Sequence, residues 1–312
     1  MSLFALIAAL LLEQYRPLSS RKYLFMWLSG YAQFFQDHFN AGQQGHGKTI
    51  WLLAVLPLLA CAIALFWMSY LVHPILAWAF NVLMLYMTMG FRQFSHYFTD
   101  IHQALRAGRL DEARGLLSRW RGIASHEFNS EEVARVTIEQ ALIASHRNVF
   151  GVIVWFVLFS AVGLGGAAGA LLYRLGQFLR ACWDDEDEAE LGEFGGFAQV
   201  AFYYLEWLPI RLTVMTFAIV GNFEDTIYCW RTQAASWFDP EEGILLAGGA
   251  GALGVRLGMP IPQGGLPFDR PELGAGDAAD ADFMQSAVGL VWRSVVFWLF
   301  LLLLLTLASL PI

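Results

Sequence analysis

The feature that most constrains this chain is an uncharged stretch from Ile50 to Phe91, which contains no Lys, Arg, Asp or Glu. A helix needs roughly 20 apolar residues to cross a bilayer, so this stretch is long enough for two crossings. His73 and Pro74 stand near its middle, where a turn would divide it. Because helices satisfy their own backbone polar groups within hydrocarbon, we expect a transmembrane hairpin over residues 51–91.

The composition indicates a membrane environment for the whole chain. Hydrophobic residues make up 57% of the 312 residues, and charged residues make up only 15%. The net charge of -8 argues against nucleic acid as a partner, because phosphates require a basic surface. The three cysteines lie far apart and match neither a disulfide framework nor a CxxC metal site, so we interpret them as packing residues.

The other apolar runs predict an all-α, polytopic helical membrane protein with the bilayer as its main partner. Its expected parts are a short N-terminal membrane helix (1–15), a cytoplasmic loop (16–50), the hairpin (51–91), a cytoplasmic helical loop domain (92–148), two transmembrane segments with an acidic external loop (149–221), a cytoplasmic Gly-rich segment (222–287) and a C-terminal transmembrane helix (288–312). Lys and Arg are concentrated in the first two loops, which places them in the cytoplasm and the protein in the inner membrane.

Within these parts, some local patterns are specific. Val149–Tyr173 is uncharged and predicts one crossing, and Ala198–Gly221 predicts the next. In the cytoplasmic loop, Asn129 followed by Glu132 is typical of a capping box that opens a helix over Glu131–Ala144. We expect two or three short helices in this loop to pack on the membrane domain.

The apolar segment Ile244–Gly258 is rich in glycine, which destabilises helices and favours close backbone approach. We therefore expect a re-entrant or pocket-lining segment rather than a crossing. Arg256 stands among these glycines and could present a guanidinium, together with backbone N–H groups, to an anionic or amide-rich ligand. The alternative is that the glycines serve only the packing of this segment.

Glu206, Pro209 and Arg211 interrupt the predicted crossing 198–221. Ionisable groups are costly in a bilayer and usually face a partner or a water-filled cavity. Two interpretations stay open: a functional pocket, or a contact of Glu206 with Arg211 or the backbone that only holds the helices together. Pro209 would kink the helix and free nearby carbonyl groups.

Two further patterns are not expected to form sites. Gly42–Thr49 matches the P-loop pattern GxxxxGK[ST], but no strand precedes it, so we interpret it as the flexible beginning of the first hairpin crossing. His96, Asp100 and His102 are close in sequence, but the two histidines would lie on different faces of a helix. We therefore expect no metal site.

Several segments share the motifs of one known family. They are ALRAGRLDEAR at 104–114, RVTIE at 135–139, EWLPIRL at 206–212, AGALGVRLG at 250–258 and PELG at 271–274. These segments resemble the CobD/CbiB family of membrane adenosylcobinamide-phosphate synthases, and the resemblance covers the chain from about Phe91 to the carboxyl end. It implies a role in cobalamin biosynthesis, in which an amide joins cobyric acid to aminopropanol or its phosphate, with ATP and Mg²⁺ as cofactors.

The resemblance also implies the residues of the site. Glu206 and Glu139 are the expected catalytic carboxylates, with Glu206 as a base or an orienting group. The residues expected to bind the corrinoid are Arg211, Pro209, Gly251, Gly254, Arg256 and Gly258.

The family's carboxylates are incompletely matched. Phe202 and Tyr203 replace its paired Asp before the PxRL segment, and His146 and Phe150 replace the Glu and Asp of its ENxxDG run. Carboxylates hold Mg²⁺ against phosphates, so their loss affects catalysis directly. Two functions therefore stay open: a cobalamin synthase, whose catalysis is retained or lost, and a non-catalytic protein similar to AmpE. The second would act in envelope sensing or β-lactamase induction with a membrane-protein partner.

Overall fold

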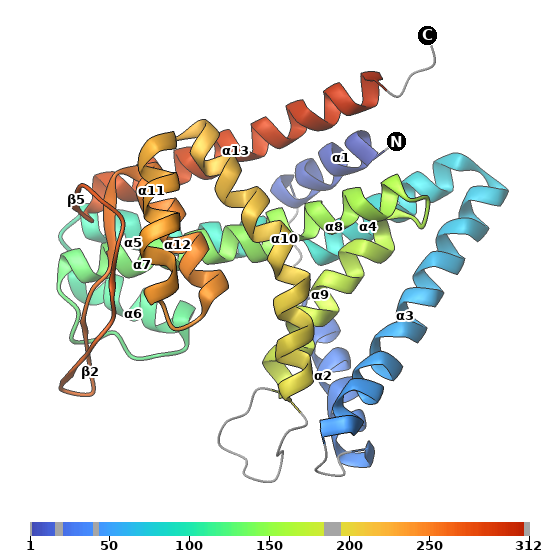
Figure 1. The fold of residues 1–312 in the computed structure, drawn as a ribbon, viewed down its shortest axis with the longest axis horizontal. Coiled ribbons are helices and arrows are strands. Elements are labelled where there is room, and N and C mark those ends of the chain that lie inside the picture. The colour runs from blue at the N-terminus through green and yellow to red at the C-terminus, as the bar shows by residue number, and fades with distance from the viewer. Residues whose placement is uncertain (1, 16–20, 40–43, 184–194, 309–312) are drawn as a thin grey trace. The chain divides into compact units, whose positions relative to one another are not determined.

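The computed structural model describes residues 2–15, 21–39, 44–183 and 195–308, and these are mostly helical (Figure 1). The chain forms two compact units. Unit 1 contains Met1–Gly90 and Gly151–Pro209, and unit 2 contains Phe91–Phe150 and Ile210–Ile312. The acidic run of the expected external loop, and the first two residues of the P-loop pattern, lie outside the described residues. The limits of the domains expected from the sequence stay predictions.

Unit 1 consists of helices. They are α1 (Ser2–Tyr15), α2 (Arg21–Phe39), α3 (Gln44–Val72), α4 (Pro74–Thr88), α8 (Gly151–Ala161), α9 (Gly166–Trp183) and the first part of α10 (Gly196–Val220). Helices α3 and α4 form the predicted hairpin, and His73 lies between them with Pro74 at the first helical position. The His73 Nδ1 atom accepts a hydrogen bond of 3.2 Å from the backbone N–H of Ile75.

The predicted crossing Val149–Tyr173 does not form a single helix. The chain turns at residues 162–165, between α8 and α9, where Gly163 and Gly165 have φ of 77° and 85°. Only glycine adopts these left-handed conformations freely. The two helices then pack closely, since a Cβ atom at Gly169 would lie 2.1 Å from the carbonyl oxygen of Trp155. An uncharged run of this length therefore forms two packed helices instead of one continuous helix.

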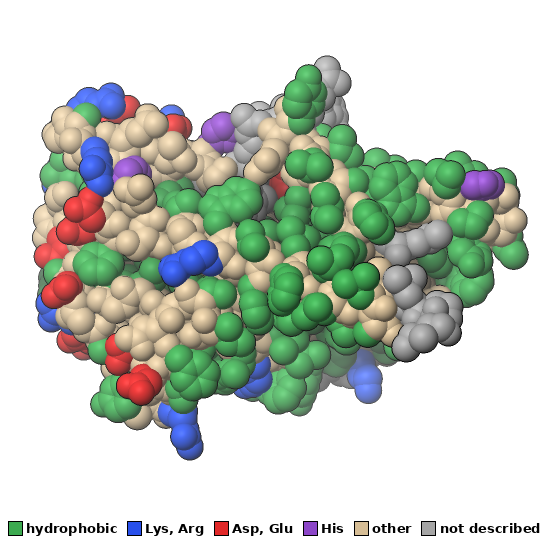
Figure 2. Space-filling view, turned by 90° about the horizontal axis from the view of Figure 1, so that it is seen from above, with side chains coloured by type: hydrophobic (Ala, Val, Ile, Leu, Met, Phe, Trp, Pro, Cys, Tyr) green, Lys and Arg blue, Asp and Glu red, His purple; other side chains and the backbone are tan. Residues whose placement is uncertain are grey.

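Three helices in the described part are long and apolar enough to cross a membrane: Gly47–Val72, Ser130–Ala161 and Ala281–Ala308. The first and third agree with predicted crossings. The second joins α7 (Ser130–Ser145), the π-helical turn η1 (His146–Phe150) and α8 without a break, so the backbone does not separate the expected cytoplasmic loop from the following membrane segment. Helix α10, predicted as a crossing, is not among the three. Broad areas of the surface seen in Figure 2 are apolar, as expected of a protein that contacts lipid.

Unit 2 contains helices and short strands. They are α5 (Phe91–Arg106), α6 (Leu110–Arg121), α7, η1, the second part of α10, α11 (Phe223–Gln233), η2 (Ala234–Ser236), α12 (Pro240–Leu253), β1 (Val255–Gly258), β2 (Ile261–Gln263), β3 (Leu266–Phe268), β4 (Glu272–Leu273), β5 (Asp277–Ala278) and α13 (Ala281–Ala308). Strand β1 lies between β4, which is antiparallel to it, and β5, which is parallel. Strands β2 and β3 form a separate antiparallel pair. The sequence patterns did not predict these strands.

The Gly-rich segment begins as the buried helix α12. A Cβ atom at Gly248 would lie 2.4 Å from the side chain of Val214, and one at Gly249 would lie 2.7 Å from Leu142. The glycines therefore let neighbouring helices approach α12 closely, which agrees with the packing interpretation. The helix ends at Gly254, which has φ of 67°. Entry of this segment into the membrane stays a prediction.

The capping box before helix α7 is confirmed. The Asn129 Oδ1 atom accepts a hydrogen bond from the backbone N–H of Glu132 at 2.8 Å, and the Glu132 carboxylate accepts one from the Asn129 N–H at 2.7 Å. We expect Asn129→Ala to lower the free energy of unfolding by about 1 kcal/mol. Unfolding of the purified protein in detergent would measure this. Asn129→Ser, which keeps a capping oxygen, should retain most of the stability; equal loss in both variants would contradict the capping role.

Candidate functional site

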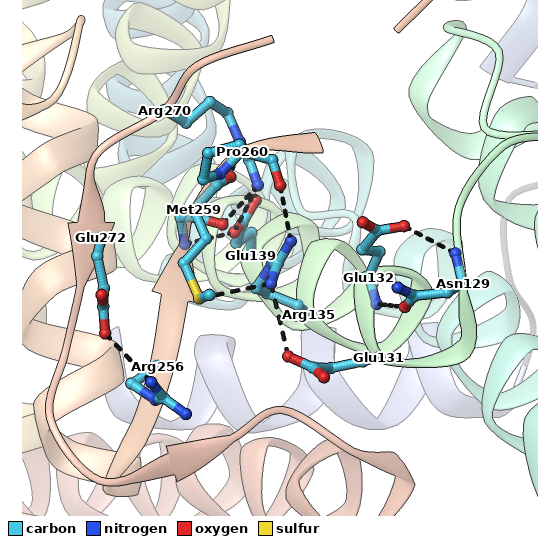
Figure 3. A network of polar contacts seen from close by, with 11 residues as sticks. Asn129, Glu131, Glu132, Arg135, Glu139, Arg256, Met259, Pro260, Arg270 and Glu272 are labelled. Atoms are coloured by element: carbon cyan, nitrogen blue, oxygen red, sulfur yellow. Dashed lines mark hydrogen bonds and ion pairs between the residues drawn. The ribbon is translucent and has the colours of Figure 1, made fainter. Parts of the chain in front are cut away.

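Glu139 lies at the centre of a buried polar network in unit 2 (Figure 3). Its carboxylate accepts hydrogen bonds from Arg270 Nη1 at 2.8 Å and Nη2 at 3.3 Å. It also accepts one from the backbone N–H of Gly258 at 2.8 Å. Both oxygens are thus engaged by the protein. In this conformation Glu139 holds the end of strand β1, and a catalytic role for it stays a prediction.

Arg270 also binds the turn that follows strand β1. Its Nη2 atom donates to the carbonyl oxygen of Gly258 at 2.9 Å, and its Nε atom donates to that of Met259 at 3.1 Å. The guanidinium carbon lies 5.5 Å from the centre of the Trp237 ring, an arrangement typical of a cation–π contact. Sequence reasoning missed Arg270. Its position directly before the PELG segment was the available signal.

Arg135 supplies a second buried guanidinium to this network and is only 3% exposed. It donates to the carbonyl oxygen of Pro260 at 3.2 Å and lies 3.7 Å from the carboxylate of Glu131 (Figure 3). Burial lowers the pKa of the nearby Arg121 from its usual value; Glu139 opposes this decrease and Arg270 adds to it. The buried carboxylate of Glu139 therefore interacts with more than one arginine.

Arg211 forms an ion pair with Glu241, and the contact with Glu206 considered from the sequence stays a prediction. The Arg211 Nη1 atom donates to the Glu241 carboxylate at 2.9 Å, and both residues lie in unit 2. Glu241 is 2% exposed and lies in the first turn of α12, where the helix dipole favours a negative charge. The contact with Arg211 gives Glu241 a structural role.

More polar contacts surround the beginning of α12. Arg147 donates to Glu242 at 2.8 Å, and the buried His146 Nδ1 atom lies 3.0 Å from the hydroxyl of Thr213. The Asp239 carboxylate caps the helix, accepting hydrogen bonds from the N–H groups of Glu241 and Glu242. Sequence reasoning missed this group because its members come from α10, α12 and the π-helical turn.

Glu206 and Pro209 belong to unit 1. Glu206 is 1% exposed, and its carboxylate lies 3.8 Å from Arg180 Nη1. Arg180 also lies over the ring of Phe202, with 5.5 Å between the guanidinium carbon and the ring centre. Pro209 lies inside helix α10. Phe202, which replaces a family Asp, thus provides an aromatic surface for Arg180.

The glycines expected to bind substrate have clear conformational roles. A Cβ atom at Gly251 would lie 2.5 Å from the carbonyl oxygen of Asp225, and Gly254 ends α12 in a left-handed conformation. Arg256 is partly exposed and lies 3.7 Å from Glu272 (Figure 3). Among the expected binding residues, Arg256 and Arg211 therefore keep guanidinium groups that are partly accessible to a ligand.

The carboxylates of the candidate site do not fit a magnesium ion in this arrangement. Glu139, Glu206 and Glu241 each lie against an arginine, which already balances the charge that a metal would require. Within the described residues, no group of three or more His, Cys, Asp or Glu side chains could hold a metal ion.

Comparison with known proteins agrees with the sequence motifs. A family described as CobD/Cbib protein matches residues 4–291. The chain is 35% identical to "Cobalamin biosynthesis protein CobD" of Stutzerimonas stutzeri, over 97% of this chain and 98% of that protein. It is 36% identical to the protein of the same name from Chromobacterium violaceum, over 72% and 70%. It is 26% identical to "Cobalamin biosynthesis protein CbiB" of Salmonella arizonae, over 79% and 77%. No solved structure shows a significant match. Since the matched region spans nearly the whole sequence, the chain belongs to the CobD/CbiB family.

Proposed function

We propose that this protein acts in cobalamin biosynthesis in the inner membrane, where it joins cobyric acid to aminopropanol or its phosphate through an amide bond. The observation that carries the proposal is the match to a cobalamin biosynthesis protein CobD over 97% of the chain. This match includes the N-terminal region, where the sequence motifs were sparse. The proposed substrates rest on the family to which the chain belongs. Complementation with these substrates is therefore the direct test.

The arrangement of the motifs supports this proposal. Arg135 and Glu139 come from RVTIE, Gly258 comes from AGALGVRLG, and Arg270 directly precedes PELG. These segments are far apart in the sequence, yet their residues meet in the single network of Figure 3. Buried charges are costly unless they are paired, as Glu139 and Arg270 are. The network therefore supports a shared functional role for these motifs.

The chemistry of the residues indicates how an anionic substrate would bind. Arg211 and Arg256 carry partly exposed guanidinium groups, and guanidinium matches the planar geometry of a carboxylate or phosphate. Glu139 is committed to Arg270 and Gly258, so we assign it the positioning of the β1 end. Glu206 stays the candidate base.

Complementation tests the proposal. The chain would be expressed in a bacterium that lacks its CobD/CbiB protein, the cells would be fed cobyric acid and aminopropanol, and the corrinoids formed would be identified. We expect cobinamide or its phosphate to accumulate. A protein that is present in the membrane yet forms neither product would contradict the proposed reaction.

The second candidate function is a non-catalytic role similar to that of AmpE. The replacement of two family carboxylates by Phe202 and Tyr203 favours it. Under this alternative the same complementation fails, while loss of the gene alters β-lactamase induction. Measuring both outcomes in one strain background distinguishes the two functions.

Two arginine variants test whether an arginine within the EWLPIRL motif matters more for activity than an arginine outside it. We expect Arg211→Ala to reduce corrinoid formation more than Arg180→Ala, because Arg211 belongs to a retained motif and binds Glu241 at 2.9 Å. Arg180 lies 3.8 Å from its carboxylate partner and stands outside the motifs. The loss for Arg211→Ala should exceed about tenfold, the effect of about 1.4 kcal/mol. Membrane levels of both variants serve as the control, and equal activity of the two would contradict a binding role for Arg211.

A further inference from the structure

Unit 1 contains a hollow that none of the family motifs lines. Its volume is about 200 Å³, and it lies between the end of α3, the beginning of α4 and the turn that joins α8 to α9. Its walls include Phe66, Tyr70, Trp78, Asn81, Ser160 and Gly165. None of the described residues that line it is charged. The hollow therefore suits a neutral ligand with a substantial apolar part.

Asn81 places an unused hydrogen-bond donor in this hollow. The side chain is 7% exposed, and its Oδ1 atom accepts a hydrogen bond of 3.0 Å from the backbone N–H of Ala167. This bond fixes the orientation of the amide group. The Nδ2 atom has no hydrogen-bond partner among the described residues and is not one of their fully buried unpaired polar atoms, so this donor is accessible from the hollow. A ligand that offers an acceptor at this point would take the hydrogen bond.

At two glycines in the wall of the hollow, there is no space for a side chain. A Cβ atom at Gly165, which has φ of 85°, would lie 2.6 Å from the ring of Phe66. At Gly166, the first residue of α9, a Cβ atom would lie 2.5 Å from the Ser160 hydroxyl. The aromatic ring thus packs directly on the backbone of the α8–α9 turn. The hollow is a defined part of the packing in unit 1.

The surroundings of the hollow indicate where its ligand comes from. Phe66 and Tyr70 lie in the last two turns of the candidate span Gly47–Val72, so the hollow is at one end of a membrane helix. The nearby side chains Leu71 and Ile75 are apolar yet 80% and 64% exposed. Apolar surface at the end of a span contacts the bilayer. The hollow is therefore within reach of lipid molecules.

We propose that this hollow binds the ester-linked end of an acyl chain of a membrane glycerophospholipid. The ester carbonyl would accept the hydrogen bond from Asn81 Nδ2, and the first methylene groups would pack against Phe66, Tyr70 and Trp78. A neutral ester matches the uncharged walls, where a phosphate would lack a counter-charge. A cavity of about 150 Å³ holds benzene, so this hollow admits only part of a lipid and is too small for a corrinoid.

The first test uses the unchanged protein. Full-length protein, purified in detergent, would be titrated with a diester phosphatidylglycerol and with the diether lipid of the same headgroup and chains, and retained lipid would be measured by native mass spectrometry. We expect the ester lipid to bind about fivefold more tightly, the ratio that one neutral hydrogen bond supplies. Equal binding of the two lipids, or a protein that retains no lipid because the hollow holds only water, would overturn the proposal.

Two variants locate the lipid in the hollow. Ala77 lines the hollow and is buried, so Ala77→Met should fill the space and reduce lipid retention, whereas Ala79→Met, at an exposed position of the same helix, should not. Asn81→Asp keeps the acceptor for Ala167 but removes the amide donor. It should abolish the preference for ester over ether lipid. Lipid retention by Ala77→Met equal to that of Ala79→Met would place the lipid elsewhere.

Discussion

Glu139→Ala is expected to lower the free energy of unfolding by about 3–5 kcal/mol, because it breaks a buried ion pair by removing one partner. Arg270 and Arg135 are 8% and 3% exposed, and both would stay buried without the carboxylate that balances them. The backbone N–H of Gly258 would also lose its acceptor. Denaturant unfolding of the purified protein in detergent would measure the change.

Glu131→Ala is the matched control for this prediction. Glu131 lies on the same helix, 3.7 Å from Arg135, but its side chain is 47% exposed. Because water screens the half-exposed Glu131 carboxylate, its contact with Arg135 should contribute about 1 kcal/mol or less, and the control should unfold almost like the original protein.

A double variant separates the ion pair from the packing around it. Glu139→Leu combined with Arg270→Met should recover part of the stability lost in Glu139→Ala, since an apolar pair of similar volume avoids an unbalanced charge. If Glu139→Ala and Glu131→Ala unfolded alike, the buried network would not stabilise unit 2 as inferred.

Gly258→Ala is expected to lower the free energy of unfolding by about 3 kcal/mol, combining the strain of a left-handed alanine with a backbone clash. Gly258 has φ of 70°, and the added Cβ atom would lie 2.0 Å from the carbonyl oxygen of Pro271. Because a backbone atom cannot rotate away, β1 would have to move from β4, and Glu139 would lose its bond to the Gly258 N–H. Unfolding in detergent and corrinoid formation in cells should both decrease.

Gly264→Ala controls for the conformational part of this effect. Gly264 has φ of 62°, but a Cβ atom there meets nothing within 4 Å. The expected loss is about 1 kcal/mol, from the left-handed conformation alone. Similar losses at both positions would show that the contact with Pro271 does not matter.

Local patterns predicted the parts of the fold that depend on neighbouring residues. The hairpin turn at His73 follows from a helix-initiating proline in an apolar run, and the capping box at Asn129 follows from two residues three positions apart. The turn between α8 and α9 could not be predicted in this way. Hydropathy is the same for one long helix and for two short packed helices, and the difference depends on the contact of Gly169 with the Trp155 backbone.

The candidate site could likewise be predicted only in part from local patterns. Motif resemblance identified Glu139, Arg211 and Gly258, but their partners lie far away in the sequence. Glu139 and Arg270 are 131 positions apart, and an ion pair over that separation is fixed by the fold and not by a local pattern. Sequence reasoning therefore found residues of the network but could not say that Glu139 is held by the protein.

The π-helical turn His146–Phe150 sets the rotational phase of the long helix that contains it. On the N-terminal side of the turn, Glu139 binds strand β1; at the end of the turn, the ring of Phe150 packs against that of Phe217, with 6.0 Å between the ring centres. Each residue of an α-helix advances the side-chain direction by about 100°. Deleting one residue of this turn before Phe150 would preserve a continuous helix yet rotate Phe150 away from Phe217 whenever Glu139 stays in place. The length of this short segment is therefore constrained as tightly as the identity of the side chains that it aligns.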